Sequence, residues 1–404
     1  MGTVTPPPSK SLSHRSIICA ALAAEGGVSE IQNLVFSDDV SATLGCLESL
    51  GAAWEKTETG VRIFASKKSG RVFDCGESGS TLRFLLPVAA LTPGEKTFTG
   101  HGRLMDRPLE PYLPVFEKMG ISLENRSGSL TLRGQLKSGT YSLPGNVSSQ
   151  FVSGLLFALP LCKGGSELAI IEPLESRAYV SMTVDVMKKF GVAVENLNFE
   201  KFIIPGGQCY NPGQFEIEAD FSQAAYFLCA AALGRNVACQ QLNQDSLQGD
   251  REILSVLAEM GADMEINEDG SIRPRVSGRL KPIVVDAREI PDIIPPIAVL
   301  CCFAGGTSQI INAGRLRLKE SDRLHALASE LSALGADITE DEDSLTIKGS
   351  PYLIGGRANA HNDHRIAMSI ALAAIKCRGT VELIGSESVQ KSFPNFWEIF
   401  CRES

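Results

Sequence analysis

Apolar segments recur along this chain at a nearly constant spacing. Each is a helix-length run of small and branched apolar residues, almost free of charge after its first turn, and glycine closes each run. The closing glycines are Gly26, Gly94, Gly164, Gly234, Gly305 and Gly379. The period is therefore about seventy residues. Because a helix that is apolar on every side is buried, the pattern predicts six buried helices.

A second series of helices keeps the same period but has one polar face. These helices end at Gly51, Gly120, Gly191, Gly261 and Gly335, and 112–119 and 324–334 are examples. A strand separates the two kinds of helix, and we place these strands at 97–99, 168–171, 237–240, 308–311 and 380–384. Alternating apolar and polar residues then predict a hairpin, as at 129–134 and 344–349.

This order of elements predicts the fold class. It gives an α/β (α+β) protein of six βαβαββ units, and the period is too long for the common solenoid repeats. We expect two lobes of three units each, with the helices buried and the sheets outside. The sixth unit reaches the chain end with a helix at 394–401, so we expect Val4, near the N-terminus, to supply its hairpin strand.

Composition narrows the class of protein. At 404 residues the chain is long for one core, and its net charge of −9 argues against a nucleic-acid binder that relies on a general positive field. The apolar runs fall short of the ~20 residues that span a bilayer, so no membrane segment is expected. The eleven cysteines include no C-x-x-C pair, and the five histidines no H-E-x-x-H motif. We expect reduced, buried thiols in a cytoplasmic protein, with no zinc and no other metal.

Cations stand where the buried helices begin. Ser, Asn and Asp are the usual caps of helix N-termini, and capping accounts for Asp220 and Asn362. It does not account for Arg15, Arg83 and Arg365, because a cation at a helix N-terminus opposes the helix dipole. We interpret these three arginines as parts of anion sites, since guanidinium and free backbone N–H groups both suit phosphate and carboxylate. The alternative is a structural role.

Other cations lie outside these helix starts. Arg107 lies in a glycine-led loop at 102–108, and Lys391 precedes the last helix. Lys319 and Arg323 are four residues apart, so we expect them on one helical face. Glu320 beside them is either a general acid or an ion-pair partner. Any one of these residues alone could be a solvated surface charge, but together they predict a small ligand with several negative charges.

Seven motifs spread through the chain form one set. They are Pro8-Ser9-Lys10-Ser11…Arg15, Gly79-Ser80…Arg83, Asp106-Arg107-Pro108, Ser148-Ser149-Gln150, Lys319-Glu320-Ser321-Asp322-Arg323, Asn362-Asp363-His364-Arg365 and Lys391-Ser392-Phe393-Pro394. In this order and over the whole chain, they resemble the 5-enolpyruvylshikimate-3-phosphate synthase family. The resemblance implies two lobes, 11–219 and 1–10 with 220–404, with an active site in the cleft between them.

The resemblance also implies a reaction and its site. The family moves the enolpyruvyl group of phosphoenolpyruvate to the 5-hydroxyl of shikimate 3-phosphate and releases phosphate, without a cofactor, and we expect a monomer. The residues implied to bind shikimate 3-phosphate are Lys10, Ser11, Arg15, Ser148, Ser149, Gln150, Ser176, Tyr179, Asp292 and Lys319. Those implied to bind phosphoenolpyruvate are Lys10, Gly79, Arg107, Gln150, Arg323, Arg365 and Lys391, with Arg83 and His364 in support. Asp292 is the implied base, and Glu320 and Lys10 are the candidates that protonate the enol carbon.

Some positions depart from the family, and rival interpretations exist. The family often has Asn where Glu77 and Arg315 stand, so we assign these two no role. Gly79 leaves room at the phosphoenolpyruvate site, which predicts inhibition by glyphosate. The nearest rival is UDP-N-acetylglucosamine enolpyruvyl transferase, but its usual reactive Cys is missing from the corresponding loop at 101–107. A non-catalytic phosphate-binding repeat protein would need the cations but neither Asp292 nor Glu320.

Overall fold

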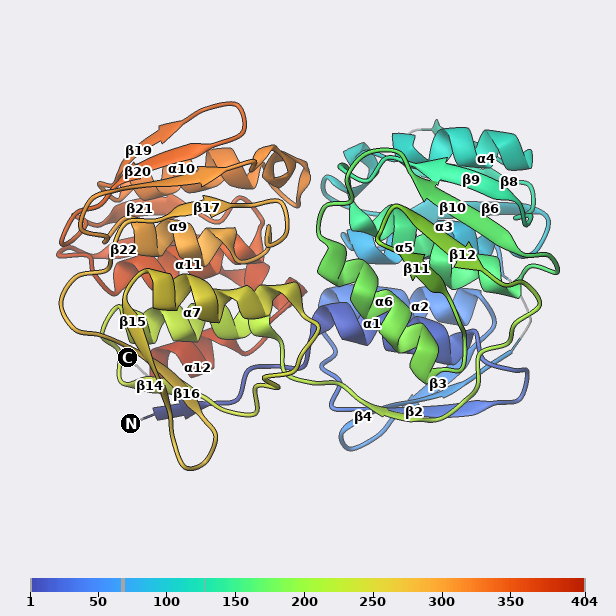
Figure 1. Ribbon diagram of the computed structural model, residues 1–404, viewed down its shortest axis with the longest axis horizontal. Coiled ribbons are helices and arrows are strands. Elements are labelled where there is room, and N and C mark those ends of the chain that lie inside the picture. The colour runs from blue at the N-terminus through green and yellow to red at the C-terminus, as the bar shows by residue number, and fades with distance from the viewer. Residues whose placement is uncertain (1, 67–69, 127, 403–404) are drawn as a thin grey trace. The chain divides into compact units, whose positions relative to one another are not determined.

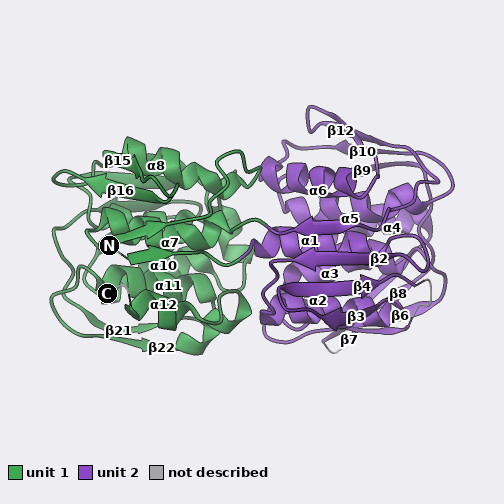
Figure 2. Cartoon of the chain, turned by 90° about the horizontal axis from the view of Figure 1, so that it is seen from below, with its two compact units in different colours: residues 1–7, 218–404 green, residues 8–217 purple. Residues whose placement is uncertain are grey.

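The computed structural model describes residues 2–66, 70–126 and 128–402 (Figure 1). The chain divides into two compact units (Figure 2). We call Pro8–Ile217 the central unit, and Met1–Pro7 with Glu218–Ser404 the terminal unit. Each unit has its own hydrophobic core. Among the described residues, no helix is both long enough and apolar enough to cross a membrane.

The central unit contains the first three repeats. Its α-helices are α1 (Lys10–Ala21), α2 (Asp38–Ser49), α3 (Gly79–Ala89), α4 (Leu113–Met119), α5 (Ser149–Ala158) and α6 (Arg177–Lys189). Short 3₁₀ helices are η1 (Leu104–Asp106), η2 (Glu110–Tyr112) and η3 (Leu159–Leu161). Its strands are β2 (Val28–Gln32), β3 (Ala53–Lys56), β4 (Gly60–Phe64), β5 (Val72–Asp74), β6 (Glu95–Thr99), β7 (Ser122–Arg126), β8 (Ser129–Arg133), β9 (Thr140–Leu143), β10 (Ser166–Ile170), β11 (Glu195–Leu197), β12 (Lys201–Ile204) and β13 (Gln214–Glu216).

The terminal unit contains the other three repeats. Its α-helices are α7 (Phe221–Ala232), α8 (Ile253–Glu259), α9 (Ile294–Cys301), α10 (Arg323–Ala333), α11 (His364–Ala374) and α12 (Phe396–Arg402). Its 3₁₀ helices are η4 (Gly249–Glu252), η5 (Gly314–Leu318) and η6 (Ser386–Lys391). Its strands are β1 (Gly2–Val4), β14 (Val237–Cys239), β15 (Ala262–Ile266), β16 (Ile272–Val276), β17 (Val284–Asp286), β18 (Thr307–Ile311), β19 (Asp337–Glu340), β20 (Leu345–Lys348), β21 (Gly356–Asn359) and β22 (Val381–Ile384).

The sheets of the described chain follow one pairing rule. In four repeats the strand before the buried helix pairs in parallel with the strand after it: β5 with β6, β9 with β10, β17 with β18, and β21 with β22. The hairpin then adds antiparallel strands, so β8 pairs with β6, and β7 with β8. Five four-stranded sheets share this order, and a sixth sheet has only β21 and β22. This recurrence confirms the predicted repeat and its fold class.

Two sheets are completed by strands that are distant in sequence. β1 pairs in parallel with β14, Gly2 opposite Val237 and Val4 opposite Cys239, so it belongs to the fourth repeat. The prediction that Val4 supplies the hairpin strand of the sixth repeat is therefore wrong. The strand that precedes α7 in sequence is β13, which pairs with β2 of the first repeat. The edge of the fourth sheet is thus open to β1, and the sixth repeat ends without a hairpin.

The predicted burial of one helix in each repeat is confirmed. Every residue of α7 and of α9 is buried. In the terminal unit these helices pack with α11, and Figure 1 shows the three helices in the middle of the unit with its strands around them. In the central unit α3 packs against α5 in the same way. The prediction of buried thiols is confirmed only in part, because eight cysteines are buried but Cys209 and Cys401 are exposed.

Helix α1 begins earlier than the apolar run suggested. Its cap is Ser9, whose Oγ accepts a hydrogen bond from the Leu12 backbone N–H at 3.4 Å. The polar first turns therefore belong to the helix, and Arg15 lies in its second turn, as Arg83 does in α3. Only Arg365 lies in the first turn of its helix. The placement of Arg15 and Arg83 at helix starts is thus wrong, since polar residues facing the unit interior were not counted as helix.

Two smaller predictions are also corrected. Asp363 rather than Asn362 caps α11, accepting from the Arg365 N–H at 2.9 Å, whereas Asn362 has a positive φ of 54°. Asp220 does cap α7, as predicted. Lys319 and Arg323 do not share a helical face, because Lys319 follows η5 in extended backbone and Arg323 is the first residue of α10.

Candidate active site

Arg15 lies buried in the central unit with neutral partners. Its Nε donates to Thr183 Oγ1 at 2.8 Å. Its Nη1 and Nη2 donate to the backbone oxygens of Ser11 (2.7 Å) and Tyr179 (2.9 Å). Within the described part of the chain no carboxylate pairs with it. Burial lowers the pKa of Arg15 to about 10, as expected for a cation that lacks a compensating negative charge.

Lys10, the first residue of α1, has an acidic partner. Its Nζ lies 2.7 Å from Asp39 Oδ2, and the two side chains are 17% and 12% exposed. Asp39 lies in the first turn of α2, where a carboxylate favours the helix dipole. Sequence analysis missed Asp39, although two adjacent acidic residues after the Ser37 cap were an available signal.

The side-chain amide of Gln150, in α5, is fixed by hydrogen bonds to two residues of α3. Its Oε1 accepts from Arg83 Nη1 at 2.9 Å, and its Nε2 donates to Ser80 Oγ at 2.9 Å. Arg83 also donates to the backbone oxygen of Pro108 at 3.0 Å, and its guanidinium lies 4.8 Å from the centre of the Phe151 ring. Arg83 therefore joins α3, α5 and the 102–108 loop.

The guanidinium of Arg107 lies over Gly79. A Cβ added to Gly79 would come within 2.7 Å of Arg107 Cζ. Within the residues that the structure describes, the Arg107 side chain makes no hydrogen bond or ion pair, and its Nε is buried. Arg107 and Arg15 are thus two cations of the central unit whose charge no carboxylate of the described residues neutralises.

Three predicted serines lie at helix starts. Ser148 caps α5, with Oγ accepting from the Gln150 N–H at 3.3 Å, and Ser149 is the buried first residue of that helix. Ser176 precedes α6, is buried and has a positive φ of 57°. Non-glycine residues with positive φ are strained and are enriched at functional sites. Ser153 Oγ lies 2.8 Å from Thr183 Oγ1, which ties α5 to α6.

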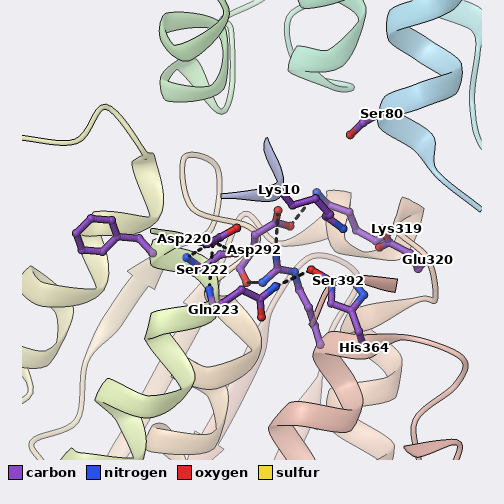
Figure 3. Close-up of polar contacts among 12 residues, drawn as sticks. Lys10, Ser80, Asp220, Ser222, Gln223, Asp292, Lys319, Glu320, His364 and Ser392 are labelled. Atoms are coloured by element: carbon purple, nitrogen blue, oxygen red, sulfur yellow. Dashed lines mark hydrogen bonds and ion pairs between the residues drawn. The ribbon is translucent and has the colours of Figure 1, made fainter. Parts of the chain in front are cut away.

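Asp292 is surrounded by cations in the terminal unit (Figure 3). Its Oδ1 lies 3.3 Å from Lys319 Nζ and 3.1 Å from Arg323 Nη1. Its Oδ2 lies 3.3 Å from Arg365 Nη2, and its backbone oxygen accepts from Arg365 Nη1 at 2.8 Å. The Asp292 side chain remains 19% exposed. The carboxylate is thus fixed in direction and still accessible.

Asp363 is an anchor of this cluster to which the sequence assigned no role. It is fully buried, and its Oδ2 accepts from Arg323 Nε at 2.8 Å and from Ser321 Oγ at 3.0 Å. Its Oδ1 caps α11 through the Arg365 N–H. The signal in the sequence was an acidic residue directly before a buried helix, which capping alone seemed to explain.

Burial and charge act in opposite directions on the cations of this cluster. Burial lowers the pKa of Lys319 to about 8, although Asp292 partly offsets this effect. Burial also acts to lower the pKa of Arg323, but Asp363, Glu320 and Asp292 outweigh it and raise the pKa. Arg365 behaves in the same way, with Asp292 as the main opposing charge. Lys319 is therefore the cation of this group that is poised to exchange a proton near neutral pH.

The remaining predicted residues of the terminal unit lie nearby in sequence and space. Glu320 Oε2 accepts from Arg323 Nη2 at 2.5 Å, so Glu320 is at least an ion-pair partner. Lys391 is 8% exposed, and its Nζ donates to the backbone oxygen of Asn362 at 2.6 Å. His364 is buried with Nδ1 3.8 Å from Asp363 Oδ1. No group of three or more His, Cys, Asp or Glu among the described residues is arranged to hold a metal ion.

Comparisons with known proteins agree on one family. Residues 1–400 match the sequence profile of EPSP synthase (3-phosphoshikimate 1-carboxyvinyltransferase). The 3-phosphoshikimate 1-carboxyvinyltransferase of Clostridium kluyveri is 46% identical over 406 residues, which cover 99% of this chain and 94% of that protein. The enzyme of the same name from Clostridium beijerinckii is 44% identical over 412 residues, with the same two coverages.

Solved structures give the same result for the fold. An EPSP synthase structure from Acinetobacter baumannii superposes with a TM-score of 0.81 at 27% identity, covering 100% of this chain and 95% of that one. The enolpyruvyl transferase NikO from Streptomyces tendae also reaches a TM-score of 0.81, at 20% identity, with 100% and 94% coverage. At that identity the second likeness concerns the fold alone.

Proposed function

This chain belongs to the EPSP synthase (3-phosphoshikimate 1-carboxyvinyltransferase) family, and on that premise we propose which of its residues carry the reaction. The enzyme transfers the enolpyruvyl group of phosphoenolpyruvate to the 5-hydroxyl of shikimate 3-phosphate, in aromatic amino acid biosynthesis. Each substrate carries a phosphate and a carboxylate. Four anionic groups repel one another unless cations surround them, and this requirement guides the assignments below.

Asp292 is the base of the proposed mechanism. In the addition, the 5-hydroxyl oxygen bonds to the central carbon of phosphoenolpyruvate, Asp292 takes the hydroxyl proton, and the methylene carbon gains a proton. In the elimination, that carbon gives a proton back and the C–O bond to phosphate breaks, which restores the enol double bond. Glu320 and Lys10 are the candidates that protonate the carbon. General acid–base steps of this kind contribute about 10²–10⁴-fold.

The cations of each unit supply the proposed binding groups. Arg15, with Ser11 and the Tyr179 backbone beside it, suits the carboxylate side of shikimate 3-phosphate. The serines at the starts of α5 and α6 suit its phosphate, because helix N-termini bind phosphate through free N–H groups. Arg107 over Gly79 suits phosphoenolpyruvate, since its guanidinium has no partner among the described residues. Arg323, Arg365 and Lys391 are proposed for the same ligand.

The observation that carries this proposal is the Asp292 cluster. The Asp292 carboxylate is contacted by Lys319, Arg323 and Arg365 from three separate segments, which fixes the direction of both of its oxygens. A protein that only bound phosphate would be weakened by a carboxylate in this place, because it repels anions. The cluster therefore favours an enzyme over the non-catalytic repeat protein.

The test is the Asp292→Asn variant in an assay of phosphate release with both substrates. We expect turnover to fall by about 10²–10⁴-fold, because the amide cannot accept the proton. Binding of shikimate 3-phosphate, measured by calorimetry, should stay within a few-fold. Asp286→Asn is a matched control, because Asp286 pairs with Arg288 on the same unit and outside the cluster. Undiminished turnover in Asp292→Asn would remove Asp292 from the mechanism.

Specificity and assembly remain proposals. We expect no phosphate release when UDP-N-acetylglucosamine replaces shikimate 3-phosphate, and release with the former would revive the rival transferase. Millimolar glyphosate should inhibit the enzyme by occupying the phosphoenolpyruvate site.

We further propose that the enzyme works as a monomer in the cytoplasm. Sedimentation velocity at micromolar concentration tests the oligomeric state, and we expect a single species with the mass of one chain.

A further inference from the structure

Among the described residues, the Gln223 side chain makes one hydrogen bond, and that bond reaches the segment carrying Lys391. Its Nε2 donates to Ser392 Oγ at 2.6 Å, as Figure 3 shows. Gln223 and Ser392 are 1% and 5% exposed, so water competes little for this bond. The Gln223 Oε1 is also buried but has no hydrogen-bond partner in the described chain. A half-satisfied amide in a core breaks a packing rule, and such exceptions concentrate where geometry serves function.

Ser392 lies directly after Lys391, at the end of η6. Its backbone N–H donates to the Val389 oxygen at 3.0 Å, which closes the last turn of η6. A hydrogen bond from Gln223 to the Ser392 side chain therefore fixes this turn against α7. Since Lys391 is the last residue of η6, the bond limits the directions in which its side chain leaves the backbone.

The same turn of α7 also contacts Arg365. Ser222 Oγ donates to Asp220 Oδ1 at 2.7 Å, so its proton is committed to that carboxylate. The hydroxyl oxygen is then left to accept from Arg365 Nη2, which lies 3.0 Å away. Asp220 is itself fixed by accepting from the Ser222 and Gln223 N–H groups. Ser222 and Gln223 thus reach Arg365 and the Lys391 segment from neighbouring positions.

We propose that the first turn of α7 is a positioning element for phosphoenolpyruvate, in which Gln223 acts through Ser392 on Lys391 and Ser222 acts on Arg365. The inference rests on the proposed function, which assigns both cations to that ligand. Gln223 is a positioning residue and touches no reacting atom. Its loss should weaken phosphoenolpyruvate binding and leave the affinity for shikimate 3-phosphate unchanged.

The test is a double-mutant cycle of Gln223→Met, Ser392→Ala and the double variant. Steady-state phosphate release is measured with each substrate varied in turn. Each single variant should raise KM for phosphoenolpyruvate about two- to tenfold, which is the value of one buried hydrogen bond. The double variant should be no worse than the singles, because both remove one interaction. Ser392→Thr keeps the hydroxyl and should restore the wild-type KM.

Two further variants separate the possible failures. Ser308→Ala removes a buried hydroxyl that accepts from the Ile283 N–H at 3.2 Å on the sheet side of the same unit. It should lower the melting temperature without changing either KM. Lys391→Met tests the premise, and an unchanged KM for phosphoenolpyruvate there would overturn the assignment of Lys391 itself. If Lys391→Met raises that KM but the cycle variants lower only stability, or raise both KM values equally, the positioning role is refuted.

Discussion

The two units treat their buried cations in opposite ways. In the central unit, Arg15 is bonded only to neutral oxygens, and burial lowers its pKa to about 10. In the terminal unit, Arg323 and Arg365 contact carboxylates, which raise their pKa values above the ordinary range despite burial. Within the described residues, the buried guanidinium of Arg15 therefore has no carboxylate beside it, whereas those of Arg323 and Arg365 do.

This difference suggests a division of labour. A buried cation without a counter-ion is costly unless a ligand supplies the missing charge, and the proposed binding of an anionic substrate by Arg15 would offset that cost. In the terminal unit the carboxylates balance the cations in the absence of ligand. They also place Asp292, the proposed base, among the cations proposed to bind phosphoenolpyruvate.

The comparison predicts that removing Arg323 from the terminal unit lowers the free energy of unfolding much more than removing Arg15 from the central unit. Arg323→Met leaves Asp363 and Asp292 with less compensation, and we expect it to lower the free energy of unfolding by about 3–5 kcal/mol. Arg15→Met strands no carboxylate and should cost less than about 2 kcal/mol. Urea denaturation of both variants without ligand measures this. Equal losses would contradict the division between the units.

Although we expect Arg15→Met to cost little stability, we expect it to have a large effect on substrate binding. Arg15→Met should weaken shikimate 3-phosphate binding by about ten- to a hundredfold, the value of one or two charged hydrogen bonds. Calorimetric titration gives the constant directly. Arg133→Met is a matched control, because Arg133 forms a surface ion pair with Glu95. A binding constant that is the same in Arg15→Met and Arg133→Met would show that Arg15 is structural.

Gly79→Ala tests Arg107, the other cation of the central unit that has no carboxylate partner among the described residues. The added Cβ would lie 2.7 Å from Arg107 Cζ, so the guanidinium must move. We expect KM for phosphoenolpyruvate to rise about tenfold, since a displaced charged hydrogen bond loses about 1.4 kcal/mol or more. Gly45→Ala, where the added Cβ meets nothing within 4 Å in helix α2, should leave this KM unchanged. Similar KM values in the two variants would disconnect Arg107 from this substrate.

The smallest expected effect is the pH dependence that Lys319 imposes on stability. Its pKa is about 8 in the folded chain and about 10.4 in an unfolded one, so between these values the unfolded state binds more protons. The free energy of unfolding should therefore rise with pH across this window, by at most about 1.4 kcal/mol per pH unit. Below pH 8 Lys319 adds no slope. Lys319→Met should flatten the rise, and an identical slope in the variant would exclude Lys319 as its source.

The repeat could be predicted from the sequence because the regular spacing of the apolar segments defines it. A buried helix such as α9 needs apolar residues on all sides, and that requirement is visible without a structure. The polar turns Lys10–Arg15 were harder, because their burial depends on partners such as Thr183, which is distant in sequence. The pairing of β1 with β14 was also hidden, since it depends on which sheet edge is left open after folding.

The site was predictable to the extent that its residues lie in recognisable motifs. The contact of Lys319 and Arg323 with one oxygen of Asp292 was not, because it joins separate segments in three dimensions. Asp363 shows a second limit. Its role as a helix cap is local and can be predicted from the sequence. Its ion pair with Arg323 depends on tertiary packing, and capping alone was already enough to explain an Asp at this position.

The parallel pairing of β1 with β14 has a consequence for biosynthesis. β1 precedes the central unit in the sequence, whereas its partner strand β14 follows it. The whole central unit is therefore synthesised before β14 is available, so Gly2–Val4 stay without their partner strand during that time. Deletion of β1 would consequently remove an edge strand from the terminal unit, although most of that unit follows the central unit in sequence.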